Sequence, residues 1–126
     1  MEDAEIAKKP LNPWKPESDP RRIAILGKLI EETNEQGSAA GRVLIQGIDE
    51  VEPVTLKPNR KWLEDEIADV LALQRFTVEE YGLDIDRIQA RAEAKITQLT
   101  PWLNSLGAPP DVRTRRERIF GTAKVG

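Results

Sequence analysis

Two pairs of acidic residues have the spacing expected of a metal site. Glu32 and Glu35 lie in the segment "EETNE", and Glu66 and Asp69 lie in the segment "EDEIAD". Residues three apart on a helix share a face, so each pair would point two carboxylates in the same direction. If two such helices lie side by side, four carboxylates converge, and their mutual repulsion calls for cations among them. Oxygen ligands of this kind suit Mg²⁺, with Mn²⁺ as the alternative ion.

Asp69 is the most informative of these residues because its neighbours are apolar. It lies within the run 67–73, "IADVLAL", which predicts a buried stretch of helix. An unpaired carboxylate in such surroundings is strongly unfavourable, and a bound metal ion would compensate its charge. For Glu31, Glu64 and Asp65, a solvated helix face is the simpler interpretation.

Composition narrows the chemistry open to the chain. The sequence has no histidine and no cysteine. Their absence excludes a disulfide framework, a thiol nucleophile and a Ser-His relay, and it removes the usual zinc ligands. A metal must therefore be held by oxygen atoms. The net charge of −3 argues against a general nucleic-acid binder.

Length and hydropathy favour one helical domain. The chain has 126 residues, of which 33% are charged and 5% aromatic, a balance that suits helices better than a sandwich or barrel. No apolar run reaches membrane-spanning length, and "MEDAEIAKK" lacks the apolar centre of a signal peptide. We therefore expect a cytoplasmic protein without a membrane partner.

Apolar periodicity predicts three long helices and one short one. The first begins at Asp19-Pro20, a favourable cap and first turn, and is interrupted at Gly37. The short helix follows and ends near Gly47. The next long helix starts near Asn59, where the asparagine can cap it.

The last long helix follows a stop near Gly82. Asp84 or Asp86 caps it, and Pro101 should kink it or end it early. The organisation expected is a proline-rich arm over 1–19, a helical domain over 20–106 and a basic tail over 107–126.

Three long helices give a thin core for one protomer. The helix after Asn59 is apolar on more than one face, and a helix of that kind lies inside a bundle. We expect an all-α fold, an antiparallel bundle completed by homo-oligomerisation as a dimer or a dimer of dimers. The alternative is a monomer whose N-terminal arm covers the apolar face.

Basic and aromatic residues near the acidic pairs are candidate substrate contacts. Arg87, Arg91 and Lys95 step by four along the last helix and could hold phosphate oxygens, or form a solvated face. Lys28 could contact phosphate or pair with the glutamate one turn later. Trp62, one turn before the second acidic pair, could stack on a nucleobase or belong to the core.

The segments "KLIEETNE" and "LEDEIADVL" resemble the signature of the MazG-like all-α nucleoside triphosphate pyrophosphohydrolases, which is ExxE on one helix and ExxD on a later one. Relatives in that family include the dimeric all-α dUTPases, the dCTP pyrophosphatases and the phosphoribosyl-ATP pyrophosphohydrolases. The resemblance covers roughly residues 20–104, and residues 41–72 are especially similar to small MazG-like proteins of phages and prophages. The metal-binding positions of the family fall on Glu32, Glu35, Glu66 and Asp69.

This resemblance implies a reaction. A (deoxy)nucleoside triphosphate would be hydrolysed to the monophosphate and pyrophosphate by a water activated by Mg²⁺. Glu31 or Glu35 would orient or deprotonate the water, and the sequence does not choose between them.

The spacing of the two motifs departs from the compact members of the family. Residues 36–65 separate them, and the extra length is the loop "IDEVEPVTLKPN". Because this loop could border the pocket, the resemblance does not imply a preferred base. Lys57, Asn59 and Arg60, at the end of the loop, are candidate phosphate or base contacts.

Two other interpretations remain open. One is a non-catalytic helical interaction protein that binds a partner or nucleic acid through the segment "RTRRER" at 113–118. The other is a metal-dependent phosphodiesterase built on the same carboxylates, which would not release pyrophosphate from a triphosphate.

Overall fold

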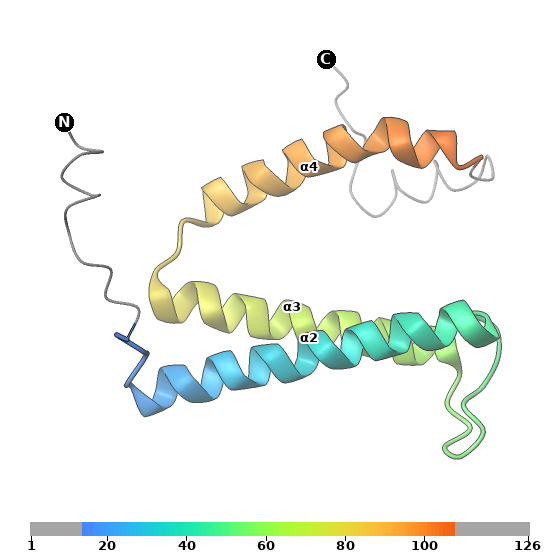
Figure 1. Ribbon diagram of the computed structural model, residues 1–126, viewed down its shortest axis with the longest axis horizontal. Coiled ribbons are helices and arrows are strands. Elements are labelled where there is room, and N and C mark those ends of the chain that lie inside the picture. Colours follow the sequence, from blue (N-terminus) through green and yellow to red (C-terminus); the bar gives the residue numbers. More distant parts are fainter. Residues whose placement is uncertain (1–13, 108–126) are drawn as a thin grey trace. The chain divides into compact units, whose positions relative to one another are not determined.

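The computed structural model describes residues 14–107, and its regular structure is helical. The described residues contain no strand, only an isolated antiparallel bridge between Val51 and Pro58. The predicted all-α class is confirmed. Residues 1–13 of the predicted arm (1–19) and residues 108–126 of the predicted tail (107–126) lie outside the described residues. The helices, in chain order, are α2 (Pro20–Gln46), α3 (Asn59–Tyr81) and α4 (Ile85–Ser105) (Figure 1).

Helix α2 is longer than predicted. It begins as expected, with the Asp19 side chain accepting a hydrogen bond of 2.9 Å from the backbone N–H of Arg21. It then continues through Gly37 to Gln46, so the predicted interruption and the separate short helix are wrong. A glycine inside a helix costs only about 1 kcal/mol relative to alanine. Packing of the helix beyond the glycine outweighs this cost, since Ala39 is only 2% exposed.

Replacement of Gly37 by alanine is expected to stabilise the protein by about 0.5–1 kcal/mol, because it lowers the backbone entropy lost on folding. A methyl group at this position would meet no atom within 4 Å. Gly82→Ala should do the opposite, because Gly82 has φ +59, a left-handed conformation that alanine adopts at a cost of about 1–2 kcal/mol. Urea unfolding of both variants tests this pair, and a destabilised Gly37→Ala would contradict it.

Helix α3 is fixed at both ends. At its end, Gly82 takes the left-handed conformation and the N–H of Leu83 donates to the Val78 carbonyl at 3.0 Å. At its start, Asn59 is the first helical residue and its side chain makes no cap; its Nδ2 instead donates to the Gly47 carbonyl at 2.9 Å. Asn59 therefore ties the start of α3 to the end of α2.

Helices α2 and α3 pack against each other in antiparallel directions (Figure 1). Among the described residues, only Ala39 and Val70 are buried hydrophobic residues. The run 67–73, predicted to be buried, is mostly exposed in the single chain, with Ile67 41% and Leu71 59% exposed. One other helix covers only one face of α3, so most of this apolar run faces outward.

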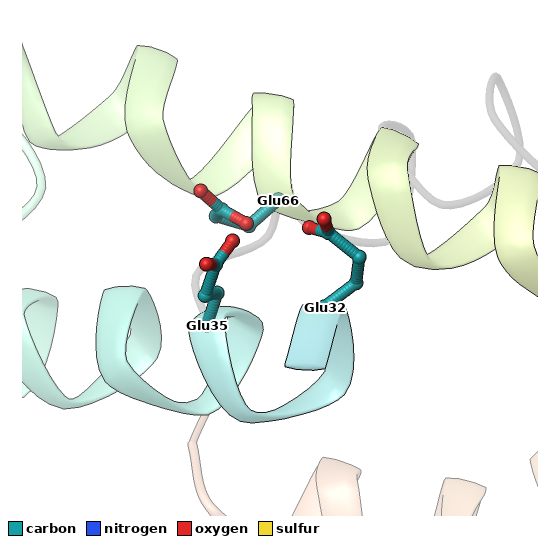
Figure 2. Close-up of side chains that lie close together, drawn as sticks. All are labelled: Glu32, Glu35 and Glu66. Atoms are coloured by element: carbon teal, nitrogen blue, oxygen red, sulfur yellow. The ribbon is translucent and has the colours of Figure 1, made fainter. Parts of the chain in front are cut away.

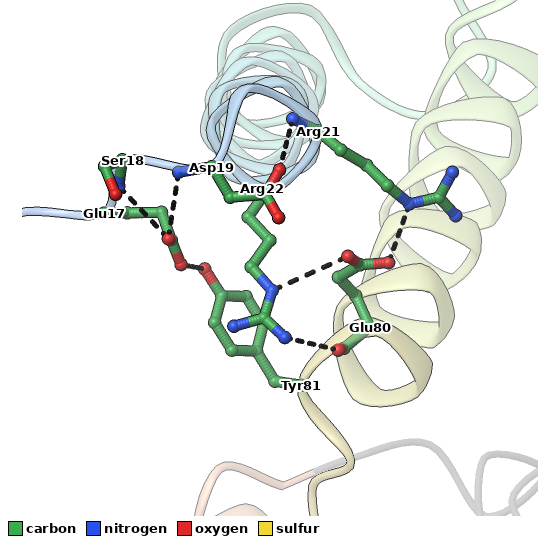
Figure 3. Close-up of polar contacts among 7 residues, drawn as sticks. All are labelled: Glu17, Ser18, Asp19, Arg21, Arg22, Glu80 and Tyr81. Carbon is green, nitrogen blue, oxygen red and sulfur yellow. Dashed lines mark hydrogen bonds and ion pairs between the residues drawn. The ribbon is translucent and has the colours of Figure 1, made fainter.

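A set of polar contacts joins the segment before α2 to the end of α3 (Figure 3). Glu17 accepts a short hydrogen bond from the Tyr81 hydroxyl, which lowers the pKa of Glu17 and raises that of Tyr81. The guanidinium of Arg22 lies 4.6 Å from the centre of the Tyr81 ring. Glu80 pairs with Arg21 at 2.9 Å and with Arg22 at 3.6 Å. These contacts hold the start of α2 against the end of α3.

The chain divides into two compact units between Leu83 and Asp84. Helices α2 and α3 belong to the first unit and α4 to the second, so the predicted domain over 20–106 spans both. Of the two predicted caps, Asp84 rather than Asp86 caps α4, accepting a hydrogen bond from the backbone N–H of Arg87 at 3.0 Å. Pro101 lies inside α4 and does not end it. None of the three helices described has the length and hydrophobicity that a membrane span requires.

Candidate metal centre

Three of the four predicted metal ligands meet where α2 and α3 pack. Figure 2 shows Glu32 and Glu35 rising from α2 toward Glu66 on α3. One carboxylate oxygen from each lies within 4.8 Å of the other two. We call these three residues the acidic cluster. The spacing of three between the first two residues gives them a common face, and the antiparallel packing supplies the third.

Two of these carboxylates are buried and only partly satisfied. Glu32 is 7% exposed and Glu66 is 8% exposed. The Oε2 atoms of both residues are shielded from solvent and have no hydrogen-bond partner within residues 14–107. Buried polar atoms are almost always paired, and an unpaired buried anion is especially costly. The cluster therefore has two buried oxygens that are free to bind a ligand.

The other oxygen of each buried carboxylate is held in place by a neighbour. Lys28 Nζ lies 3.2 Å from Glu32 Oε1 and also 3.2 Å from Glu31 Oε1. These contacts, with Glu32 the larger contributor, raise the pKa of Lys28. Trp62 Nε1 donates to Glu66 Oε1 at 3.1 Å. One oxygen of each carboxylate is thus used for orientation and the other is left for a ligand.

Glu35 differs from its two neighbours because it is exposed. The negative charge of Glu32 is the main cause that raises the pKa of Glu35, and partial burial and the charge of Glu66 add to it. This direction indicates excess negative charge within the cluster. A divalent cation would reverse that balance by favouring the ionised form of Glu35.

Asp69 and Glu31 do not join the acidic cluster. Asp69 lies one turn after Glu66 and is exposed, so the expected buried setting is not found in the single chain. Its role as a fourth ligand stays a prediction. Glu31 is exposed and pairs with Lys28. Of the two candidates for acting on a water, the cluster contains Glu35 only.

The predicted basic stripe lies on the second unit. Arg87, Arg91 and Lys95 are all exposed on α4. Their contact with phosphate stays a prediction. Lys28, which was expected either to contact phosphate or to pair with a glutamate, makes the pair.

Arg42 is a candidate functional residue that the sequence analysis missed. Its guanidinium lies 4.8 Å from the centre of the Trp62 ring, and its Nε is buried without a hydrogen-bond partner among the described residues. Arg42 follows Glu35 by seven residues, a spacing that returns to the same helix face. The predicted break at Gly37 concealed this relation, because it placed Arg42 on a different helix.

Comparison with known proteins provides no relative. No protein-family model, no curated protein and no solved structure matches the chain. The resemblance to the MazG-like enzymes therefore rests on the sequence features described above, chiefly the ExxE and ExxD motifs. Inference about function therefore depends on the geometry of the acidic cluster and its neighbours.

Proposed function

We propose that this protein is a divalent-metal-dependent nucleoside triphosphate pyrophosphohydrolase. It would hydrolyse (d)NTP to (d)NMP and pyrophosphate. The observation that carries the proposal is the pair of buried, unpartnered oxygens on Glu32 and Glu66, two members of the acidic cluster that forms where α2 packs against α3. The likeness of the two motifs to the MazG-like enzymes supplies the reaction class.

The donor set fits a hard cation. The acidic cluster offers carboxylate oxygens, and the chain contains neither histidine nor cysteine to favour a softer metal. Mg²⁺ binds through a few carboxylates and keeps water in its remaining positions, and Mn²⁺ accepts similar ligands. When bound, such an ion supplies neutralisation of phosphate charge and a water of lowered pKa. Glu32, Glu35 and Glu66 would hold it, with Asp69 as the fourth ligand.

The protein residues have separate tasks in this reaction. Glu35 is the exposed member of the cluster, and for this reason we propose that it accepts a proton from the attacking water. Lys28 and Trp62 hold Glu32 and Glu66 in position through the contacts described above. Contact of Arg87, Arg91 and Lys95 with phosphate oxygens of the substrate stays part of the proposal, because guanidinium and ammonium groups match such oxygens.

We infer that the active form is a homodimer or a dimer of dimers. The α2–α3 pair leaves large apolar side chains exposed, including Ile67 at 41%, Leu71 at 59% and Phe76 at 53%. Ile67 and Leu71 lie one turn apart on the same face of α3, and exposed apolar surface of this kind marks interfaces. Light scattering of the full chain should give at least twice the 14.2 kDa protomer mass, and Leu71→Lys should lower it. A monomeric wild type would contradict this inference.

The function is tested by measuring pyrophosphate release from a panel of NTPs and dNTPs, with Mg²⁺ and with EDTA. Metal-dependent release from at least one nucleotide is expected. A folded protein that releases no pyrophosphate from any of them would exclude the proposal and favour the interaction protein. Release of other products would favour the phosphodiesterase.

A further inference from the structure

A cavity lies beside the acidic cluster, at the loop end of the α2–α3 pair. Its volume is about 410 Å³, within the range of small-molecule sites. It lies wholly within the first unit, between the end of α2, the loop over 47–58 and the start of α3. Its lining residues are Arg42, Glu52, Val54, Thr55, Lys57 and Trp62.

The loop that forms one wall is held in a defined shape. The buried carboxylate of Glu52 accepts hydrogen bonds from the Val54 N–H at 3.0 Å and from the Thr55 hydroxyl at 2.7 Å. The Glu52 N–H donates to the Lys57 carbonyl at 2.9 Å. Asn59, only 1% exposed, fastens the loop to the end of α2. The cavity is therefore present before any ligand binds.

Arg42 has a buried hydrogen-bond donor without a partner among the described residues. Lys57 Nζ lies 2.6 Å from Asp65, and the Glu52 carboxylate is occupied by the loop. The Trp62 N–H is used by the acidic cluster. The Nε of Arg42, by contrast, is buried and unpaired within the described part of the chain. Because Arg42 lines the cavity, its guanidinium is the group we expect to donate to an acceptor on a ligand.

The remaining surface suits a flat ligand. The Arg42 guanidinium stacks over the Trp62 indole, 4.8 Å from the ring centre. Planar heterocycles bind to such stacks through dispersion and cation–π contacts. Along α2, Arg42 follows Glu35 by seven residues, which is about 10 Å at 1.5 Å per residue. An extended ligand could therefore reach from the acidic cluster into the cavity.

The geometry points to this cavity as the site for the base of the nucleotide, with Arg42 donating a hydrogen bond to a ring carbonyl oxygen of that base. This inference rests on the proposed function, because the phosphates of the same ligand would lie at the acidic cluster. In this inference the loop over 47–58 contributes to selection of the substrate. Uracil and hypoxanthine carry such a carbonyl, whereas adenine carries none.

Binding to the cavity can be measured without hydrolysis. The chain has three tryptophans, Trp14, Trp62 and Trp102, so the indole N–H signal of Trp62 can be assigned in ¹⁵N NMR spectra by comparison with Trp62→Phe. Uridine, inosine and adenosine are titrated into the full chain in EDTA. Inosine and uridine should shift the Trp62 signal saturably. Adenosine should bind at least about tenfold more weakly, the equivalent of one hydrogen bond.

Variants of the lining residues sharpen the test. Arg42→Gln should remove the difference between inosine and adenosine. Val54→Trp should weaken all three nucleosides by filling the cavity, and it should fold normally because Val54 is 87% exposed. Arg75→Gln, an exposed arginine on α3 outside the cavity, is the matched control and should leave binding unchanged.

The outcomes separate this inference from the proposed function. Pyrophosphate release together with a Trp62 signal that no nucleoside moves, and a base preference that Arg42→Gln leaves intact, would overturn the base site alone. A Trp62 signal that responds to inosine in a protein that releases no pyrophosphate would support the base site and overturn the hydrolase.

Discussion

Glu66→Gln is expected to lower metal-dependent pyrophosphate release by on the order of 10²- to 10⁴-fold. Removing one partner from a buried set of opposite charges, here a carboxylate that would pair with the metal ion, costs about 3–5 kcal/mol. Each 1.36 kcal/mol corresponds to a tenfold change in rate. Glutamine has nearly the same shape and keeps an oxygen to accept the hydrogen bond from Trp62, so the change removes charge with little loss of packing. Steady-state release of pyrophosphate at saturating Mg²⁺ measures the effect.

Glu64→Gln is the matched control for this experiment. Glu64 lies two residues earlier on α3, is exposed and is not part of the acidic cluster. Its release rate should stay close to that of the wild type. Equal activity of Glu66→Gln and Glu64→Gln would show that the acidic cluster is not the metal site. Asp69→Asn in the same series tests the fourth ligand, since full activity would mean that three carboxylates suffice.

Mg²⁺ is expected to raise the thermal midpoint of the wild type and to leave that of Glu66→Gln nearly unchanged. A ligand that binds only the folded state stabilises it by about 2.7 kcal/mol at a concentration one hundred times its dissociation constant. For a domain of this size each kcal/mol raises the midpoint by about 4–8 °C. Thermal unfolding followed by circular dichroism, in EDTA and over a Mg²⁺ series, measures this shift.

In EDTA, the same measurement should show a change in the thermal midpoint of Glu66→Gln that has the opposite sign. Without a cation, the ionised cluster opposes folding because Glu32 and Glu66 hold unpaired buried oxygens near a third carboxylate. Glu66→Gln removes one of these charges, so it should unfold at a higher temperature than the wild type in EDTA. A variant that is less stable than the wild type in both conditions would mean that Glu66 has a structural role instead.

The interaction-protein alternative makes a different prediction for both experiments. It requires no metal-dependent stabilisation, and it places function in the segment at 113–118, which lies outside the described residues. The buried position of Glu32 and Glu66 argues against it, because a helix that only displays acidic residues to a partner would keep them solvated. A Mg²⁺-dependent midpoint would therefore separate the two functions before any substrate is known.

Local chemistry could be predicted from the sequence alone. The helix starts at Asp19 and Asp84 and the helix end at Gly82 are set by capping and by a left-handed φ, which depend on a few adjacent residues. The lack of histidine and cysteine limits any bound metal to oxygen ligands, and the spacing of three placed Glu32 and Glu35 on one face. These properties do not depend on what packs against each helix.

The tertiary structure decided which residues meet. A spacing of three gives Glu66 and Asp69 a similar direction, but the position of α2 along α3 determines that Glu66 is buried in the cluster and Asp69 is exposed. Packing of α2 also overrode the helix-breaking tendency of Gly37, and only then does Arg42 come to lie over Trp62. The reason is that contacts between two helices depend on how far each is shifted along its axis and rotated about it. Many residues that are distant in the sequence determine that shift and rotation together.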